Sequence, residues 1–157
     1  HFDYDWGVYT DMRSNVSGFR RLGALKADLV LKVLRANRHV LLSDTDVVWL
    51  ADPEPILRTM WAADVMSATD CLSITADEHN TSRPRGVNRC AHRPGNSEGH
   101  AAFNTGVLFF RATLAASAVA AAWRRRLLSV EPDKWLDDQL AFNELVWHGF
   151  RNNAAGA

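Results

Sequence analysis

Two aspartates stand one residue apart directly after an apolar run of the chain. Residues 39–50 read HVLLSDTDVVWL, and the apolar character breaks at Asp44-Thr45-Asp46. Alternation along an extended chain places Asp44 and Asp46 on the same side. Mg²⁺ and Mn²⁺ prefer oxygen ligands and commonly bridge one or two carboxylates to substrate phosphates. The pair therefore predicts a divalent-cation site, with a turn whose acids cap backbone N–H groups as the alternative.

A second polar segment, Asn104-Thr105-Gly106, opens the apolar run FNTGVLFFR. Amide and hydroxyl groups suit the hydroxyls of a sugar, and glycine permits a ligand to approach closely. The alternative is an ordinary turn that leads into a strand. The segment is a candidate part of a sugar-binding site.

A third segment, WLDDQLAFN at residues 135–143, places Asp137 and Asp138 at the start of an expected helix. Carboxylates there complement the helix dipole, which is the ordinary reason to find them at that position. Gln139 adds a neutral donor and acceptor that such capping does not need.

The elements that must position these groups follow from periodicity and from breaker residues. Asn37 and Thr113 are the expected stop of the first helix and the N-cap of a later one. The expected elements are a helix at 17–37, a strand at 40–43 with a continuation at 47–50, a helix at 54–61, strands at 64–69 and 103–111, and helices at 113–130 and 136–148. This order predicts an α/β domain with a largely parallel sheet flanked by helices, which binds ligands at the carboxyl ends of its strands.

Composition limits the partners. At 157 residues and 47% hydrophobic composition, the chain is long enough for one core. Its formal net charge is zero, so no overall field draws it to nucleic acid or to an anionic membrane. The longest near-apolar stretch, at 114–123, is far shorter than a bilayer span. Residues 70–100 are polar and have no clear period, which predicts a functional or mobile loop rather than a linker.

The two cysteines, Cys71 and Cys90, lie within that segment and lack the spacing of a metal site. They are either two free, partly buried thiols or a disulfide that implies an oxidising compartment. Asn15-Val16-Ser17 and Asn80-Thr81-Ser82 are glycosylation sequons. Sequons and a possible cysteine pair favour the lumen of the secretory pathway.

Together the three polar segments resemble nucleotide-diphospho-sugar transferases of the GT-A type. The most similar group is the plant and algal glycosyltransferase family 77, which includes arabinosyl-, xylosyl- and galactosyltransferases of cell-wall glycans and hydroxyproline-rich glycoproteins. The resemblance rests on SDTDVVWLADP, FNTGVLFFR and DDQLAFN, which run in family order between Gly18 and Asn143. It implies a GT-A (Rossmann-like) fold and metal-dependent transfer from a nucleotide-diphosphate sugar, with retention of configuration. It also implies a Golgi enzyme, anchored in the membrane through a segment outside this chain.

The resemblance assigns the metal and donor contacts. Asp46 would ligate Mn²⁺ or Mg²⁺, and Asp44 would contact the metal or the ribose of the nucleotide. Lys26 matches a lysine that reaches the donor in related retaining transferases, with a solvated helix lysine as the alternative.

The remaining roles concern the sugar. Asn104, Thr105 and Gly106 would border the donor sugar or the acceptor, and Asp137 is a further candidate for such a contact. Asp138 and Gln139 would lie at the reacting face of the sugar as the catalytic pair. Cleavage of the sugar–diphosphate bond develops negative charge on the leaving diphosphate, which the cation neutralises. It also develops oxocarbenium character on the sugar, which an oxygen of the catalytic pair stabilises.

We expect residues 1–157 to form one partial glycosyltransferase domain. Such domains normally begin with a nucleotide-binding strand, which is not evident after His1, and a later histidine commonly completes the metal shell. His148 is not assigned to that role. We therefore expect the rest of the site to lie outside this chain.

Two other functions remain open. Asp44-Thr45-Asp46-Val47-Val48 also fits the nucleophile loop of haloacid-dehalogenase-like phosphatases, in which Asp44 would attack phosphate with Mg²⁺ assistance. Such an enzyme needs a downstream lysine and then an acidic pair, and Lys134 and Asp137-Asp138 are too close together for that. The third possibility is a non-catalytic, carbohydrate-binding relative or fragment.

Overall fold

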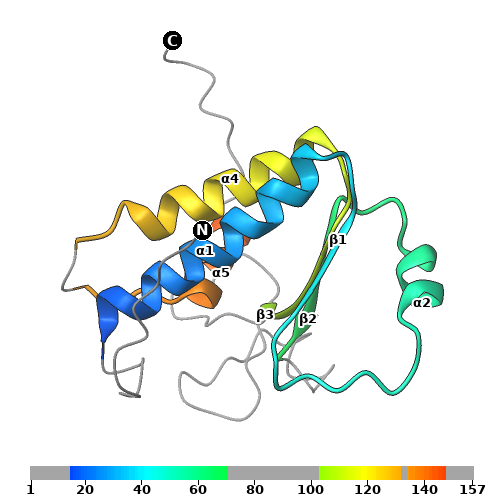
Figure 1. Cartoon of the computed structure of the whole chain (residues 1–157), viewed down its shortest axis with the longest axis horizontal. Coiled ribbons are helices and arrows are strands. Elements are labelled where there is room, and N and C mark those ends of the chain that lie inside the picture. The colour runs from blue at the N-terminus through cyan, green and yellow to red at the C-terminus, as the bar shows by residue number, and fades with distance from the viewer. Residues whose placement is uncertain (1–14, 71–102, 132–133, 148–157) are drawn as a thin grey trace.

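The computed structural model describes residues 15–70, 103–131 and 134–147. Its elements are α1 (Val16–Arg35), β1 (Val40–Ser43), α2 (Glu54–Thr59), β2 (Val65–Thr69), β3 (Phe103–Phe110), α4 (Leu114–Leu128) and α5 (Asp138–Trp147). Helices α1, α4 and α5 lie on one side of the sheet, and the short α2 stands beyond its other side (Figure 1). The α/β class is thus confirmed. None of the described helices is long and apolar enough to cross a membrane.

The expectation of a largely parallel sheet is wrong for the described strands. Their order is β1-β3-β2, and β3 runs antiparallel to both neighbours. Periodicity identifies a strand but carries no information on its direction, which is decided by the strand's pairing partners. Because the central strand is reversed, its first residues lie beside the last residues of β1 and β2. This reversal brings Asn104-Thr105-Gly106 next to the segments that follow both outer strands.

An irregularity in β3 shapes the same end of the sheet. The register with β2 passes from Ser67↔Leu108 directly to Ala68↔Asn104, so residues 105–107 have no register partner in β2. The Ser67 hydroxyl donates to the carbonyl oxygen of Asn104 at 3.0 Å. A bulge of this kind bends a strand and re-aims its side chains, and bulges are frequent next to active sites.

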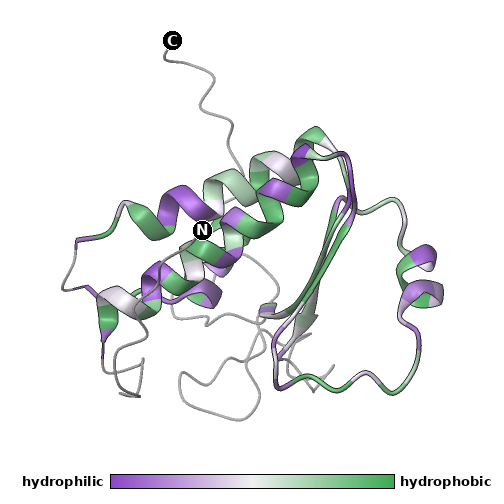
Figure 2. Ribbon diagram, in the orientation of Figure 1, coloured by the Kyte–Doolittle hydropathy of each residue, from purple (hydrophilic) through white to green (hydrophobic). Residues whose placement is uncertain are grey.

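The core lies between the helical layer and one face of the sheet. Hydrophobic residues predominate along the strands and alternate with hydrophilic ones around α1 (Figure 2). Alanines of α1 and α4 belong to the same buried cluster as the large side chains of β3, α4 and α5. Trp123 is fully buried, and its ring meets Phe142 edge-to-face at 5.7 Å. The alanine bias of the sequence therefore serves packing between helices.

Local signals set most of the element ends. The side chains of Asn15 and Thr113 accept hydrogen bonds from the backbone N–H groups of Gly18 and Ala116, at 2.9 and 3.1 Å, and so cap α1 and α4. Asn37 has a positive φ of 55° just beyond α1, a conformation in which asparagine is one of the better-tolerated residues. The expected stop and N-cap are confirmed, and the expected helices and strands agree with the observed ones to within about two residues.

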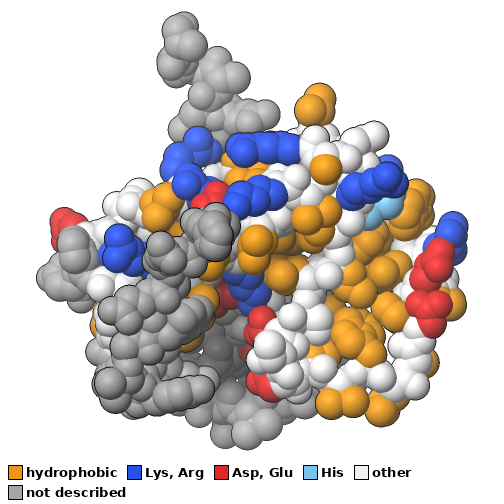
Figure 3. All heavy atoms as spheres, viewed as in Figure 1, with side chains coloured by type: hydrophobic (Ala, Val, Ile, Leu, Met, Phe, Trp, Pro, Cys, Tyr) orange, Lys and Arg blue, Asp and Glu red, His pale blue; other side chains and the backbone are white. Residues whose placement is uncertain are grey.

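The expected strand continuation at residues 47–50 is wrong. This stretch has no regular secondary structure, and the side chains of Val48 and Leu50 are 79% and 95% exposed. Trp49 of this stretch lies on the sheet face that α1, α4 and α5 leave uncovered. Hydrophobic side chains gather over the sheet and α2 in this view (Figure 3). A groove of about 190 Å³ runs there between α2 and residues of all three strands.

Several expectations concern residues outside the described ranges. These are the state of Cys71 and Cys90, the sequon at Asn80, residues 71–100 of the loop predicted at 70–100, and the assignment of His148. The first sequon is described, and its Asn15 is an exposed helix cap.

Candidate functional site

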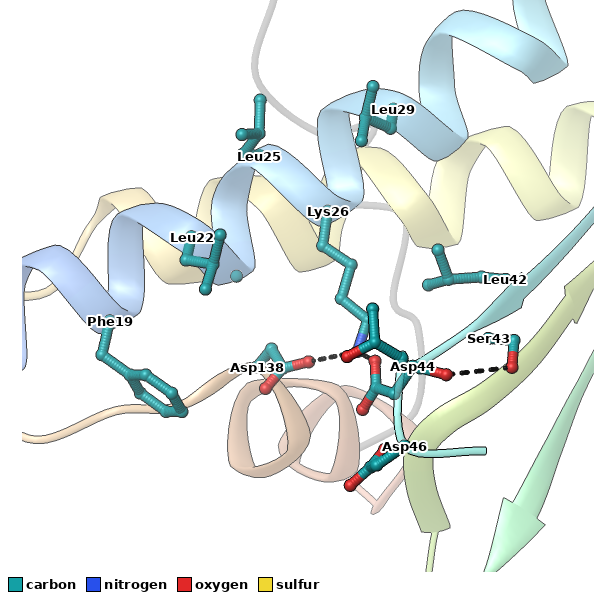
Figure 4. Close-up of a pocket in the computed structure, with 12 residues that line it drawn as sticks. Phe19, Leu22, Leu25, Lys26, Leu29, Leu42, Ser43, Asp44, Asp46 and Asp138 are labelled. Carbon is teal, nitrogen blue, oxygen red and sulfur yellow. Dashed lines mark hydrogen bonds and ion pairs between the residues drawn. The ribbon is translucent and has the colours of Figure 1, made fainter. Parts of the chain in front are cut away.

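A cavity of about 480 Å³ opens between α1, the segment that follows β1, and the start of α5. Its polar lining includes Lys26, Asp44, Thr45, Asp46 and Asp138, and α1 contributes an apolar wall (Figure 4). Three of the charged groups come from segments 18 to 112 residues apart in the chain. The fold thus joins the Asp-Thr-Asp segment and the Asp-Asp-Gln segment at one place.

Lys26 lies at the centre of this arrangement. Its Nζ donates to Asp44 Oδ1 at 2.8 Å and to Asp138 Oδ2 at 2.9 Å. The Lys26 side chain is 16% exposed, so it is not a solvated helix lysine. Burial lowers the pKa of Lys26, but the charge of Asp138 and the hydrogen bonds to both carboxylates outweigh burial and raise the pKa above 10.5. Lys26 is therefore a fixed cation at neutral pH.

Asp44 and Asp46 lie on the exposed segment directly after β1. The backbone N–H of Asp44 donates to the carbonyl oxygen of Gly106 at 2.8 Å, which extends the β1–β3 pairing by one residue. Asp44 retains 45% side-chain exposure despite its ion pair, and Asp46 is also exposed and faces the cavity. Both carboxylates are accessible to a ligand in the cavity.

The Asn104-Thr105-Gly106 segment forms the bulged part of β3. Thr105 is buried, and its hydroxyl donates to Asp138 Oδ2 at 3.0 Å. Asn104 Oδ1 accepts from the backbone N–H of Gly106 at 2.6 Å. A Cβ on Gly106 would lie 2.7 Å from that Asn104 oxygen and 3.3 Å from Asp44 Oδ2, so only glycine fits without displacing either group.

The start of α5 supplies the other predicted residues. Asp137 Oδ1 accepts from the backbone N–H of Leu140 at 2.6 Å, which is an N-cap interaction. Its predicted contact with donor or acceptor stays a prediction. Asp138 faces Lys26 and Thr105, and its carbonyl oxygen accepts from the indole N–H of buried Trp123 at 2.8 Å. The core thus anchors the residue that carries the candidate catalytic carboxylate.

Two residues that build the site were missed from the sequence. Asp70, just after β2, accepts hydrogen bonds from the side-chain amides of Asn104 and Gln139. Gly23 lies inside α1, where a Cβ would be only 2.9 Å from Asp138 Cβ. An isolated glycine in a helical pattern is a recognisable signal of close packing, because glycine costs about 1 kcal/mol relative to alanine there. Asp70 carried no comparable signal.

The charge of the cavity fits a cation. Three carboxylates and one ammonium line it, so its formal charge is −2. A nucleoside diphosphate is itself an anion and needs a cation to approach such a lining. Among the described residues, no group of three or more His, Cys, Asp or Glu side chains could hold a metal ion. The cation site predicted at Asp44 and Asp46 therefore stays a prediction. Mg²⁺ often takes only one or two carboxylates and completes its shell with substrate phosphates and water.

The phosphatase alternative lacks its lysine in this structure. Lys134 forms an exposed ion pair with Glu131, and both side chains are about two-thirds exposed. The lysine that contacts Asp44 is Lys26, which precedes it in the chain. The phosphatase motif requires a lysine that follows the aspartate in the chain. The lysine at Asp44 precedes it instead.

Comparison with known proteins identifies relatives. A model of the nucleotide-diphospho-sugar transferase family matches residues 4–156. Arabinosyltransferase XEG113 of Arabidopsis thaliana is 31% identical over 144 residues, which cover 92% of this chain and 19% of that protein. Beta-arabinofuranosyltransferase RAY1 of the same plant is 33% identical over 81 residues, which cover 52% of this chain and 13% of that protein. No solved structure matches.

The chain thus spans less than a fifth of the length of the curated relatives that it matches. The family match nevertheless covers nearly all of its residues, including the three polar segments. Two of these segments line the cavity, and the third contacts them through Thr105 and Gly106. The chain belongs to the nucleotide-diphospho-sugar transferases, a family of glycosyltransferases, as its motifs predicted.

Proposed function

We propose that the protein containing this chain is a metal-dependent glycosyltransferase that moves a sugar from a nucleoside-diphosphate donor to a glycan or hydroxyproline-rich glycoprotein. The observation that carries this proposal is the meeting of Asp44, Lys26 and Asp138 at one cavity in a chain of this family. Arabinose is the first candidate for the sugar, because both relatives are named as arabinosyl- or arabinofuranosyltransferases.

Asp46 and Asp44 would hold Mn²⁺ or Mg²⁺ at the rim of the cavity. When bound, the cation would neutralise the charge that develops on the leaving diphosphate. Lys26 adds a fixed positive charge beside Asp44, which lowers the cost of bringing the anionic donor to this negative lining.

Asp138 and Gln139 are the proposed catalytic pair at the reacting face of the sugar. A carboxylate oxygen near the anomeric carbon stabilises the developing oxocarbenium charge. The hydrogen bonds from Lys26 and Thr105 hold the Asp138 carboxylate in one orientation. Asn104, Thr105 and Gly106 would border the sugar or acceptor. Retention of configuration and a place in the Golgi lumen are carried over from the family resemblance.

The first test uses the full-length protein and three donors, UDP-arabinofuranose, UDP-xylose and UDP-galactose. Each is incubated with Mn²⁺ or with EDTA, and release of UDP is measured. We expect Mn²⁺-dependent release with one donor. Asp46→Ala should then lower the rate by about a hundredfold or more, since a cation supplies several kcal/mol of transition-state stabilisation and about 1.4 kcal/mol is worth tenfold.

The matched control is Asp52→Asn. Asp52 follows the same segment, but its Oδ1 accepts from the backbone N–H of Glu54 at 2.9 Å at the start of α2, and an asparagine can do the same. Its activity should equal that of the unmodified protein. Full activity in Asp46→Ala would overturn the metal-site assignment. Inactivity of the unmodified protein with every donor would favour the non-catalytic alternative.

A further inference from the structure

Asp70 connects three elements of the site through a single carboxylate. It directly follows β2, and its Oδ1 accepts from Asn104 Nδ2 in β3 at 2.6 Å. Its Oδ2 accepts from Gln139 Nε2 in α5 at 2.8 Å. Both hydrogen bonds are partly buried. The carboxylate therefore ties the bulged strand to the helix that carries the proposed catalytic pair.

The oxygen of each of these two amides also accepts a hydrogen bond from a backbone N–H group. Gln139 Oε1 accepts from the N–H of Thr105 at 3.4 Å, and Asn104 Oδ1 accepts from the N–H of Gly106 at 2.6 Å. A backbone N–H only donates and a carboxylate only accepts. An amide rotated by half a turn would face a donor with its NH₂ group and a carboxylate with its oxygen. Only one orientation of each amide satisfies both neighbours.

We propose that Asp70 is a positioning residue of the sugar-transfer site, which holds the amides of Asn104 and Gln139 in a single orientation. This inference rests on the proposed function. The oxygen and the NH₂ group of an amide are nearly equal in size, so packing alone does not distinguish the two orientations. Rotation would exchange a negative for a positive partial charge beside the sugar, and a site that stabilises an oxocarbenium ion depends on that sign.

Asp70→Asn tests the proposal with almost no change in volume. The new amide offers one acceptor where the carboxylate offered two, and its NH₂ group must face that of Asn104 or Gln139. We expect kcat in the full-length protein to fall by about tenfold or more, because a misplaced catalytic group costs rate strongly. KM for the donor should change less. The assay is Mn²⁺-dependent UDP release with the donor that the unmodified protein uses.

A compensating substitution separates positioning from direct action on the substrate. In the double variant Asp70→Asn, Asn104→Asp, the new amide donates to the new carboxylate and its oxygen accepts from Gln139 Nε2. The new carboxylate still accepts from the N–H of Gly106, and the total charge is unchanged. We expect this variant to recover most of the kcat lost in Asp70→Asn. Recovery of the melting temperature without recovery of kcat would overturn the proposal, because the restored hydrogen bonds would then not be what the rate depends on.

Asp64→Asn is the structural control. Asp64 directly precedes β2 at its opposite end, and its Oδ1 accepts from the Thr113 hydroxyl at 2.8 Å, away from the amides. Its kcat should match that of the unmodified protein. Wild-type kcat in Asp70→Asn would overturn the positioning role alone. An unmodified protein that releases UDP from no donor would overturn the proposed function and this inference with it.

Discussion

Gly23 is the residue whose smallness allows two parts of the site to meet. It lies in α1, and the Cβ and the backbone of Asp138 in α5 pack against the place where its side chain would be. Three residues later on the same helix, Lys26 reaches the carboxylate of that aspartate. Because Gly23 has no side chain, α5 can approach α1 closely enough for Lys26 to reach the proposed catalytic carboxylate.

We predict that Gly23→Ala lowers the activity while it changes the stability little. Alanine is favoured over glycine within a helix by about 1 kcal/mol, which offsets part of the clash with Asp138. The start of α5 must move, so Mn²⁺-dependent UDP release should fall on the order of tenfold to a hundredfold while the melting temperature changes little.

Gly18→Ala is the matched control for that substitution. Gly18 lies in the first turn of the same helix, where an added Cβ would contact only the side chain of Asn15 among its nearest neighbours. It should disturb the cap and leave the turnover rate unchanged. Wild-type turnover in Gly23→Ala would contradict the view that the α1–α5 distance controls the site.

At the scale of elements, the reversed strand β3 explains why three distant segments meet. Its first residues lie beside the segments that follow β1 and β2, and its bulge frees residues 105–107 from pairing with β2. Thr105 can therefore contact Asp138, and Gly106 can approach Asp44. In a parallel β3, these residues would lie at the opposite end of the strands, away from Asp44 and Asp138.

Helix α4 begins at a residue that also contacts the sheet. The Thr113 hydroxyl accepts from the N–H of Ala116 at 3.1 Å and donates to Asp64 Oδ1 at 2.8 Å. Thr113→Ala removes both interactions and should cost about 1–2 kcal/mol of stability. Hydrogen exchange of the first turn of α4, measured by mass spectrometry in the full-length protein, should become faster. Thr113→Ser keeps the hydroxyl and should remain close to the unmodified protein. An equal effect of both substitutions would contradict the capping role.

For the whole molecule, Lys26 joins the helical layer to the end of the sheet. Because its pKa is raised above 10.5 in the folded state, the folded protein holds this proton more tightly than the unfolded chain. Its contribution to stability is therefore present in full below pH 10.5 and is lost as the pH rises through the folded pKa. The difference in melting temperature between the unmodified protein and Lys26→Met should shrink over that range.

Lys26→Arg provides the comparison for the pH experiment. Arginine has a higher pKa than lysine and stays protonated to a higher pH, so the difference between Lys26→Arg and Lys26→Met should persist where that of lysine shrinks. Other groups titrate in the same range, but their effects are common to all three proteins and cancel in the differences. A difference between lysine and methionine that is independent of pH would contradict the ion-pair role.

The uncovered sheet face is a second property of the whole molecule. Trp49, Ile56 and Met60 line an apolar groove between the sheet and α2. On this face of the sheet, α2 is the longest helix that the structure describes. The exposure of this surface is the reason why the strand prediction at 47–50 was wrong. An apolar run such as VVWL favours a buried strand, yet burial depends on whether another element packs on it, which no local pattern reveals.

The sequence by itself determined most of the elements and the family of the protein. Strand 40–43, the cap at Thr113 and the stop at Asn37 were all predicted, because each depends on a residue and its near neighbours. The pair of aspartates and the two other polar segments, taken together in their order, resemble the nucleotide-diphospho-sugar transferases, and the family match confirms this resemblance.

Only the tertiary structure decided which of these groups touch. The direction of β3, its bulge and the approach of α5 to Gly23 depend on pairing and packing between residues far apart in the chain. The role of Asp70 depends on two amides that come from different elements, 34 and 69 residues away. A local sequence pattern cannot reveal such contacts. The energy of a hydrogen bond or of a close packing contact depends on distance in space and not on separation along the chain.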